Sequence, residues 1–241
     1  MKASLPSTDL QRIRLSLGSS VHFKDLPAGT LDRLAQLGTS ALLEDGDVVH
    51  GGWQPVDKLW LVLSGALRLV LLSEDGSAFT AAVIGAGSFY GAASFVKDEI
   101  SPAEAYAIGR TEAAVFDMDR LQREFANDKA VKAHVKRLIY RRLNAIVSAY
   151  RDALTVPLPR RLARRLLSQA LASGHDSETA VIELRVSQDD LAAMLGASRS
   201  KVNAELRKLE SAGAVQRGYR SVVVRDLDRL REAAGPGVVP Y

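Results

Sequence analysis

The 241-residue sequence contains no cysteine. This absence excludes disulfide bonds, thiolate nucleophiles, thiolate-bound iron–sulfur clusters and cysteine-ligated zinc sites, and it favours a reducing compartment. Histidine is also scarce, with four residues whose spacing is not that of metal ligands: His22, His50, His134 and His175. We therefore expect no metal, haem or iron–sulfur cofactor, and we expect these histidines to be ordinary surface or core residues.

Long hydrophobic runs are missing as well. The longest, residues 59–72, is interrupted by Ser64-Gly65 and by Arg68, and is too short to cross a bilayer. The first 18 residues alternate polar and apolar side chains, so we expect no secretory leader and no membrane partner. A composition that is 47% hydrophobic and 25% charged can bury a core. These features predict a soluble cytoplasmic protein.

The net charge of +4 is unevenly distributed along the chain. Residues 1–117 carry 9 Lys and Arg against 14 Asp and Glu, residues 118–175 carry 13 against 4, and the remainder carries 10 of each. An acidic first half and a basic middle suggest that a polyanion contacts only part of the molecule. A solvated, arginine-rich helix face is the simpler alternative. The uneven charge therefore supports polyanion binding only if a binding motif is also present.

Hydrophobic periodicity divides the chain near residue 118. Before this point, two short helical patterns are followed by β-like runs at a spacing of about 8–12 residues, separated by turn signals such as Ser64-Gly65. This pattern predicts an antiparallel β-sandwich or β-barrel over residues 1–118, in which Trp53 and Trp60 are packing residues. The expected strands are residues 41–43, 48–49, 58–63, 66–72, 79–84, 105–108 and 113–116.

After residue 118 the apolar residues follow steps of three and four, and no glycine or proline intervenes before Pro157. We predict one long helix within residues 119–156, about 35 residues or roughly 50 Å in length. Its apolar surface forms two ridges, which favours packing against its own domain and against a second copy, with packing inside one chain as the alternative. The predicted dimer contacts are Val135, Ile139, Leu143, Ile146 and Tyr150.

Pro157 and Pro159 indicate a hinge before a third region, residues 157–241. Within it, Ser187 and Asp190 can form a capping-box-like helix start, and Gly196 can end that helix. Ser198 can cap a second helix a few residues later. This arrangement predicts a helix-turn-helix whose second helix, from Arg199 to about Ser211, enters a major groove.

The side chains of the second helix indicate which residues would contact DNA. Arginine and lysine can pair with guanine and asparagine with adenine, whereas other basic side chains bind phosphates without reading sequence. Residues 215–224 read as a hairpin with a basic tip, a possible wing along the DNA backbone. The predicted base-reading residues are Arg199, Ser200, Lys201 and Asn203, and the predicted backbone contacts are Ser187, Arg207, Lys208, Arg217 and Arg220. A structural helix pair with solvated charges is the alternative.

Two segments, LAAMLGASRSKVN at residues 191–203 and GSFYGAA at residues 87–93, resemble the Crp–Fnr family of bacterial transcription regulators. The resemblance covers most of the chain. It implies an α+β fold with an N-terminal antiparallel, jelly-roll-like β-roll as sensor domain, a long dimerisation helix and a C-terminal winged helix-turn-helix, and no enzymatic activity. It also implies a homodimer on near-palindromic double-stranded DNA, with recognition helices about 34 Å apart and RNA polymerase as a partner.

The second segment is similar to the family's phosphate-binding cassette, which implies an effector pocket at Phe89, Gly91, Ala92, Ala93, Pro102 and Ala103. Cyclic-AMP-binding members place a glutamate after the glycine that matches Gly91, where this sequence has Ala92. They also place an arginine and a serine or threonine where it has Pro102 and Ala103. Losing these contacts would weaken cyclic AMP by about 10²–10⁴-fold.

We therefore expect an effector other than cyclic AMP, or none. A regulator that binds a cyclic nucleotide in a variant pocket is the first alternative. A cupin-like β-barrel enzyme with a helical accessory domain is a second, although such an enzyme needs a cluster of metal ligands. A DNA-binding architectural protein without sequence preference is a third.

Overall fold

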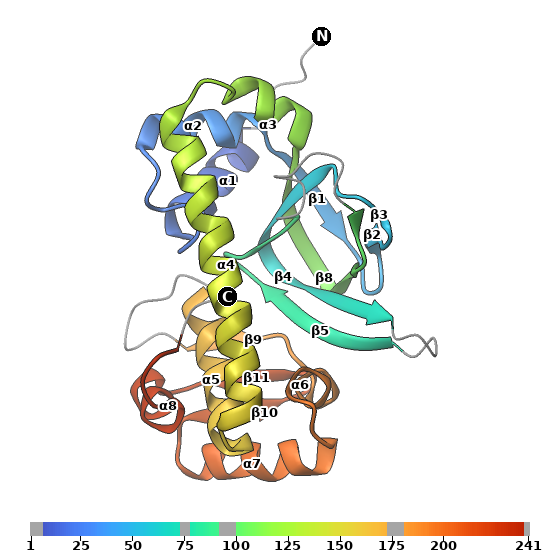
Figure 1. Cartoon of the computed structure of the whole chain (residues 1–241), viewed down its shortest axis with the longest axis vertical. Helices are drawn as coiled ribbons and strands as arrows, with labels where there is room; N and C mark the ends of the chain where they lie inside the picture. The colour runs from blue at the N-terminus through green and yellow to red at the C-terminus, as the bar shows by residue number, and fades with distance from the viewer. Residues whose placement is uncertain (1–6, 73–77, 92–99, 173–180, 239–241) are drawn as a thin grey trace. The chain divides into compact units, whose positions relative to one another are not determined.

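The computed structural model describes residues 7–72, 78–91, 100–172 and 181–238 (Figure 1). Its elements fall into two compact units. One takes the chain up to Arg68 and from Ile84 to Arg141, and the other takes Leu69–Val83 and the chain from Arg142 onward. The elements are α1 (Ser7–Ser19), α2 (Ala28–Leu37), β1 (Thr39–Leu43), β2 (Val48–Gly51), β3 (Gln54–Pro55), β4 (Lys58–Leu72), β5 (Ala78–Gly85), β6 (Phe89–Tyr90), β7 (Ile100–Ser101), β8 (Glu104–Asp117), α3 (Met118–Glu124), α4 (Lys129–Thr155), α5 (Leu158–Ala172), β9 (Ile182–Leu184), α6 (Gln188–Leu195), α7 (Arg199–Ser211), β10 (Val215–Gly218), β11 (Ser221–Val224) and α8 (Leu227–Ala234).

The first unit is built around an antiparallel β-roll, as the sequence predicted. The main sheet has the order β1-β8-β4-β5, with β2 also paired to β8 and β6 to β4, while β3 and β7 form a separate pair. Strand β1 aligns with the end of β8 so that Thr39 lies opposite Val115. Helices α1, α2 and α3 gather at one end of the roll (Figure 1).

The predicted turn at Ser64-Gly65 is wrong, because β4 runs through it without a break. Gly65 adopts a φ of +84° inside the strand. A Cβ atom at this position would lie 2.4 Å from Thr111 Oγ1 and 2.7 Å from Thr111 Cα on β8. The glycine is therefore needed for the close approach of two strands rather than for a chain reversal. Strand β8 is likewise continuous where two short strands were predicted.

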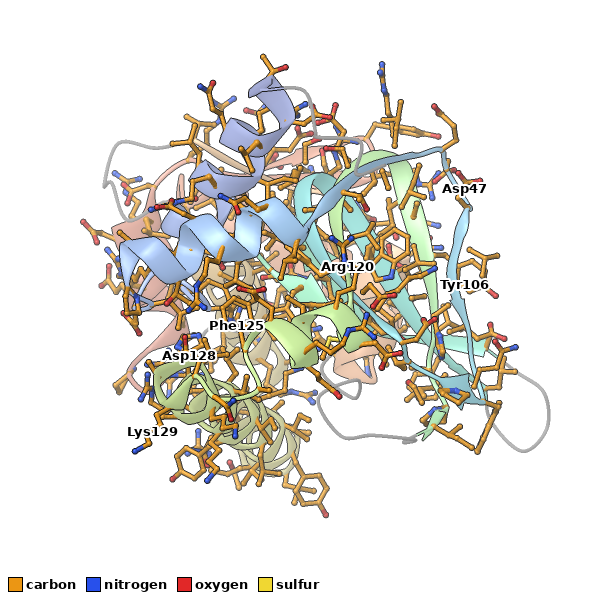
Figure 2. The ribbon with its side chains drawn as sticks, turned by 90° about the horizontal axis from the view of Figure 1, so that it is seen from above. Asp47, Tyr106, Arg120, Phe125, Asp128 and Lys129 are labelled. Carbon is orange, nitrogen blue, oxygen red and sulfur yellow. The ribbon has the colours of Figure 1, made fainter. Side chains whose placement is uncertain are left out.

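The predicted 35-residue helix is also wrong, because the structure has a short helix α3 and a 27-residue helix α4. Phe125 ends α3 and is buried in the core of the first unit, with the Arg33 guanidinium 4.7 Å from its ring centre. Asp128 lies directly before Lys129, the first residue of α4 (Figure 2). Its Oδ1 accepts the backbone N–H groups of Ala130 (3.0 Å) and Val131 (3.1 Å). These bonds lower the pKa of Asp128, and they make the break a capped helix start.

Trp53 does not pack as expected. It follows Gly52, has a φ of +50° and is 70% exposed, whereas Trp60 on β4 is half-buried. The apolar core of this unit is formed instead by Ile13 and Leu17 of α1 together with strand and helix residues such as Leu61, Phe89 and Phe116.

The second unit contains helices α5 to α8 and a three-stranded antiparallel sheet of order β10-β11-β9. One leucine or more from each helix is almost fully buried in its core. These residues are Leu162, Leu166, Leu191, Leu206, Leu227 and Leu230. None of the described helices combines the length and the apolar character needed to cross a membrane.

Candidate nucleic-acid interface

The helix-turn-helix begins with the capping box that the sequence predicted. Ser187 Oγ accepts the backbone N–H of Asp190 at 3.0 Å, and Asp190 Oδ2 accepts the backbone N–H of Ser187 at 3.1 Å. At the other end of α6, Gly196 has a φ of +57°, a left-handed conformation that glycine adopts without strain. The caps therefore set both ends of α6 and the direction in which the chain enters the next helix.

We expect Ser187→Ala to reduce the free energy of unfolding by about 1 kcal/mol, because the first turn of α6 loses the acceptor for a backbone N–H. Urea unfolding of the full chain measures this change. Ser211→Ala removes an exposed hydroxyl at the end of α7 and is the matched control. Equal unfolding midpoints for the two variants would contradict a stabilising capping box.

Helix α7 presents one face to the core and the other to solvent. Ser198 Oγ accepts the N–H of Lys201 as the helix cap, and Val202 and Leu206 are fully buried. The four predicted base-reading residues lie together at the amino end of α7. Arg199, Ser200 and Lys201 are exposed, and Asn203 is half-buried.

Two charged residues of this face make local ion pairs. Arg199 Nη1 lies 3.2 Å from Asp189 Oδ2, and both side chains are 66% exposed. Lys208 pairs with Glu205 at 2.8 Å on the helix surface, while the Arg207 side chain is exposed. An exposed pair such as Arg199–Asp189 contributes little to stability, so a phosphate or a base can replace its carboxylate at small cost.

Arg217 is half-buried and makes three hydrogen bonds to α7 that sequence reasoning missed. Its Nε donates to Glu210 Oε2 at 2.7 Å, its backbone N–H donates to Glu210 Oε1 at 2.9 Å, and its Nη1 donates to Asn203 Oδ1 at 2.9 Å. Arg217 thus links the β10–β11 hairpin to α7 and orients one of the predicted base-reading side chains. The seven-residue spacing of Asn203 and Glu210, two turns on one helix face, was the available signal.

The Glu210–Arg217 pair predicts a pH dependence. The backbone N–H of Arg217, and then its guanidinium, lower the pKa of Glu210 below its ordinary value of 4.5. The stabilisation is therefore present above pH 4.5 and is lost as the pH falls through the lower pKa of the folded state. At pH 7, Glu210→Gln should unfold at a lower urea concentration than the parent protein. The difference between their unfolding midpoints should shrink as the pH falls below about 4.5.

Glu232→Gln, at an exposed position of α8, is the control for that comparison. If the unfolding midpoints of Glu210→Gln and the parent protein differ by the same amount at every pH, the ion pair does not cause the difference.

The tip of the β10–β11 hairpin carries Tyr219 and Arg220. Tyr219 is 93% exposed, and Arg220 is exposed with a φ of +52°. Sequence reasoning identified the basic tip but assigned no role to Tyr219. The exposed aromatic side chain of Tyr219, next to Arg220 in the sequence, is available for contact with a partner surface.

The residues predicted for an effector pocket divide into three groups. Phe89 is 2% exposed, and its ring lies 5.4 Å from that of Phe23. Gly91 has a φ of +106°, and a Cβ there would lie 2.3 Å from the carbonyl oxygen of Lys58, so both residues have packing roles. Pro102 is exposed and Ala103 is half-buried, while Ala92 and Ala93 lie outside the described residues.

No group of three or more histidine, aspartate or glutamate side chains suited to a metal ion occurs in the part of the chain that the structure describes. The amino end of α7 presents exposed guanidinium, hydroxyl and ammonium groups and the half-buried amide of Asn203. Such groups bind phosphates and the edges of bases.

Comparison with known proteins agrees with this description. Residues 42–128 match the cyclic nucleotide-binding domain, and residues 160–233 match the Crp-like helix-turn-helix domain. The chain is 25% identical over 190 residues to the CRP-like cAMP-activated global transcriptional regulator of Mycobacterium tuberculosis, covering 78% of this chain and 85% of that protein. It is 28% identical over 207 residues to the transcriptional regulator SdrP of Thermus thermophilus, covering 83% and 96%.

Among solved structures, FixK2 from Bradyrhizobium japonicum has a TM-score of 0.65 at 20% identity, with 83% of this chain and 98% of that chain covered. This likeness supports the fold alone. The matched proteins are regulators and not enzymes, which rejects the cupin-like alternative. With a cyclic nucleotide-binding domain followed by a Crp-like helix-turn-helix, the chain belongs to the Crp–Fnr family of DNA-binding transcription regulators.

Proposed function

We propose that this regulator acts as a homodimer in the cytoplasm and reads a near-palindromic DNA site through α7. The observation that carries the proposal is the clustering of Arg199, Ser200, Lys201 and Asn203 at the exposed amino end of α7, opposite its buried apolar face. Ser187, Arg207, Lys208, Arg217 and Arg220 would contact the DNA backbone, with Arg217 also orienting Asn203. RNA polymerase is the proposed protein partner, as is typical of the family.

The exposed surface of α4 supports the homodimer. Four of the five predicted dimer contacts leave much of their surface in water, and Val135 is half-buried. Ile139 is 42% exposed, Leu143 54%, Ile146 55% and Tyr150 68%. A ridge of large apolar side chains along one helix is suited to pairing with its copy. We assign residues 119–156 to dimerisation, residues 1–118 to sensing and residues 157–241 to DNA binding.

We further propose that the β-roll responds to a small molecule other than cyclic AMP. The match to the cyclic nucleotide-binding domain supports a small-molecule site in this part of the chain. The sequence departs from the cyclic-AMP pattern at Ala92, Pro102 and Ala103, so the charged contacts to ribose and phosphate are missing. The relative described as cAMP-activated is the Mycobacterium tuberculosis protein, and a variant cyclic-nucleotide pocket stays the alternative for this chain.

Selection of bound fragments from a random DNA pool tests the proposed function. We expect enrichment of two inverted half-sites whose centres are about one helical turn apart, 10–10.5 base pairs. Cyclic AMP should not change the enriched site or its affinity, whereas a fraction of cell metabolites containing the effector should. Retention of random duplex without enrichment would overturn sequence-specific reading and favour an architectural role.

A further inference from the structure

The second unit contains a small pocket with a surplus of positive charge. It lies between the carboxy-terminal half of α4, α5 and α6 and has a volume of about 90 Å³. Its apolar walls include Ala145, Ala149 and Leu195. Its charged and polar walls are formed by Asp152, Arg161, Arg164, Arg165 and Ser168, which gives three guanidinium groups against one carboxylate.

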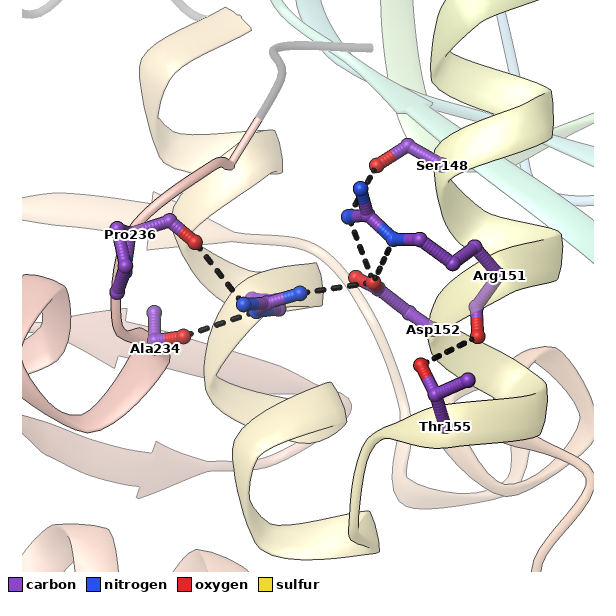
Figure 3. Close-up of polar contacts among 7 residues, drawn as sticks. Ser148, Arg151, Asp152, Thr155, Ala234 and Pro236 are labelled. Atoms are coloured by element: carbon purple, nitrogen blue, oxygen red, sulfur yellow. Dashed lines mark hydrogen bonds and ion pairs between the residues drawn. The ribbon is translucent and has the colours of Figure 1, made fainter.

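The carboxylate and one of the guanidinium groups satisfy each other. Arg164 Nη1 donates to Asp152 Oδ1 at 2.7 Å, while its Nε and Nη2 donate to the carbonyl oxygens of Ala234 and Pro236, both at 2.9 Å (Figure 3). Burial alone would raise the pKa of Asp152, but hydrogen bonds from Arg164 and Arg151 lower it below its ordinary value. Asp152 is therefore charged and is already shared by two arginines.

The other two arginines line the same pocket from α5. Arg161 Nε is buried and has no hydrogen-bond partner among the residues that the structure describes. Arg165 Nη2 donates to Met194 Sδ at 2.8 Å, and a thioether sulfur is a weak acceptor. Burying the Arg161 donor in a pocket with a surplus of positive charge is unfavourable unless a strong acceptor is supplied. An oxyanion supplies such acceptors, and guanidinium groups bind phosphate through paired N–H donors.

We propose that this pocket binds a single phosphate group through Arg161 and Arg165, with the Ser168 hydroxyl on the same wall. A volume of about 90 Å³ is well below the roughly 300–1,000 Å³ of sites that enclose drug-sized ligands, so the pocket fits a phosphate and not a whole nucleotide. The group can come from inorganic phosphate or from a monoester whose remainder lies outside. A bound phosphate would join α4, which carries the exposed apolar ridge, to α6, the first helix of the helix-turn-helix.

Isothermal titration of the full chain with inorganic phosphate and, separately, with adenosine 5′-monophosphate tests the proposal at constant ionic strength. We expect saturable binding and a higher thermal unfolding midpoint than in chloride. Arg161→Gln should weaken binding at least tenfold, and Arg161→Lys should bind with intermediate affinity because it keeps the charge and loses the paired donors. Binding by both probes, or by one of them, identifies the source of the phosphate group.

Arg160→Gln is the matched control, since it removes the same charge from an exposed neighbouring position on α5. Unfolding midpoints in chloride show whether each variant is folded. The proposal is overturned if phosphate stabilises the protein no more than chloride does. It is also overturned if folded Arg161→Gln and Arg160→Gln bind phosphate as well as the parent protein. Neither outcome depends on DNA binding, so the proposed function is tested separately.

Discussion

Ile146→Glu is expected to convert the protein to a monomer and to lower its affinity for a two-half-site DNA by at least a hundredfold. Ile146 lies near the middle of the apolar ridge on α4 and is 55% exposed in the single chain. In the proposed dimer this position becomes buried, where an unpaired carboxylate is strongly unfavourable. A monomer also loses the effective-concentration advantage of two linked recognition helices, which reaches 10²–10⁴-fold.

Ala133→Glu is the matched control, because it places the same charge at an exposed position of the same helix. At 3.6 residues per turn, Ala133 lies on nearly the opposite side of α4 from Ile146. Sedimentation equilibrium measures the oligomeric state, and fluorescence anisotropy measures the affinity for DNA. An Ile146→Glu protein that stays dimeric, or a monomer that binds DNA as tightly as the parent, would contradict the assigned role of α4.

Arg199→Ala is expected to weaken binding to the preferred site by about 1–3 kcal/mol and to relax selection at one base position. The guanidinium can contact guanine through two N–H groups, and alanine offers no replacement. Its present pair with Asp189 is exposed and therefore exchanges readily for a base edge. The measurement is competition binding against the selected site and against variants carrying each single base change.

Arg207→Ala is the comparison variant for that experiment, since Arg207 is exposed on the same helix and is assigned to the backbone. It should weaken all sequences by a similar factor and leave the base preference unchanged. If Arg199→Ala leaves both affinity and preference unaltered, Arg199 does not read a base, and the assignment of α7 as the recognition helix needs revision.

The helix-turn-helix was predictable because its signals act between neighbours in the chain. Ser187 and Asp190 are three residues apart, and Ser198 caps the helix that follows it directly. Gly196 adopts the left-handed conformation that the end of α6 requires. Local hydrogen bonding and backbone preference were sufficient here, and the family resemblance rests on this same segment.

Other features were decided by contacts between residues distant in the sequence. Gly65 resembles a turn residue until Thr111, 46 positions later, approaches its α-carbon. Phe125 fits a helical period, but its burial in the β-roll core ends α3, and Asp128 starts a new helix. The sequence identifies Arg217 only as a basic residue of the hairpin, and the fold adds its contacts with Glu210 and Asn203.

The sequence by itself thus determined the order of the domains, the capped helix pair and the apolar ridge of α4, because each depends on spacing within a few turns of one element. Only the tertiary structure decided where α4 begins and which arginines, such as Arg164, bind acceptors within the protein. It also decided that Arg161 lines the small pocket with a buried Nε that has no acceptor among the described residues. The charge and burial around these residues depend on elements that are distant in the sequence, so a local sequence pattern does not predict them.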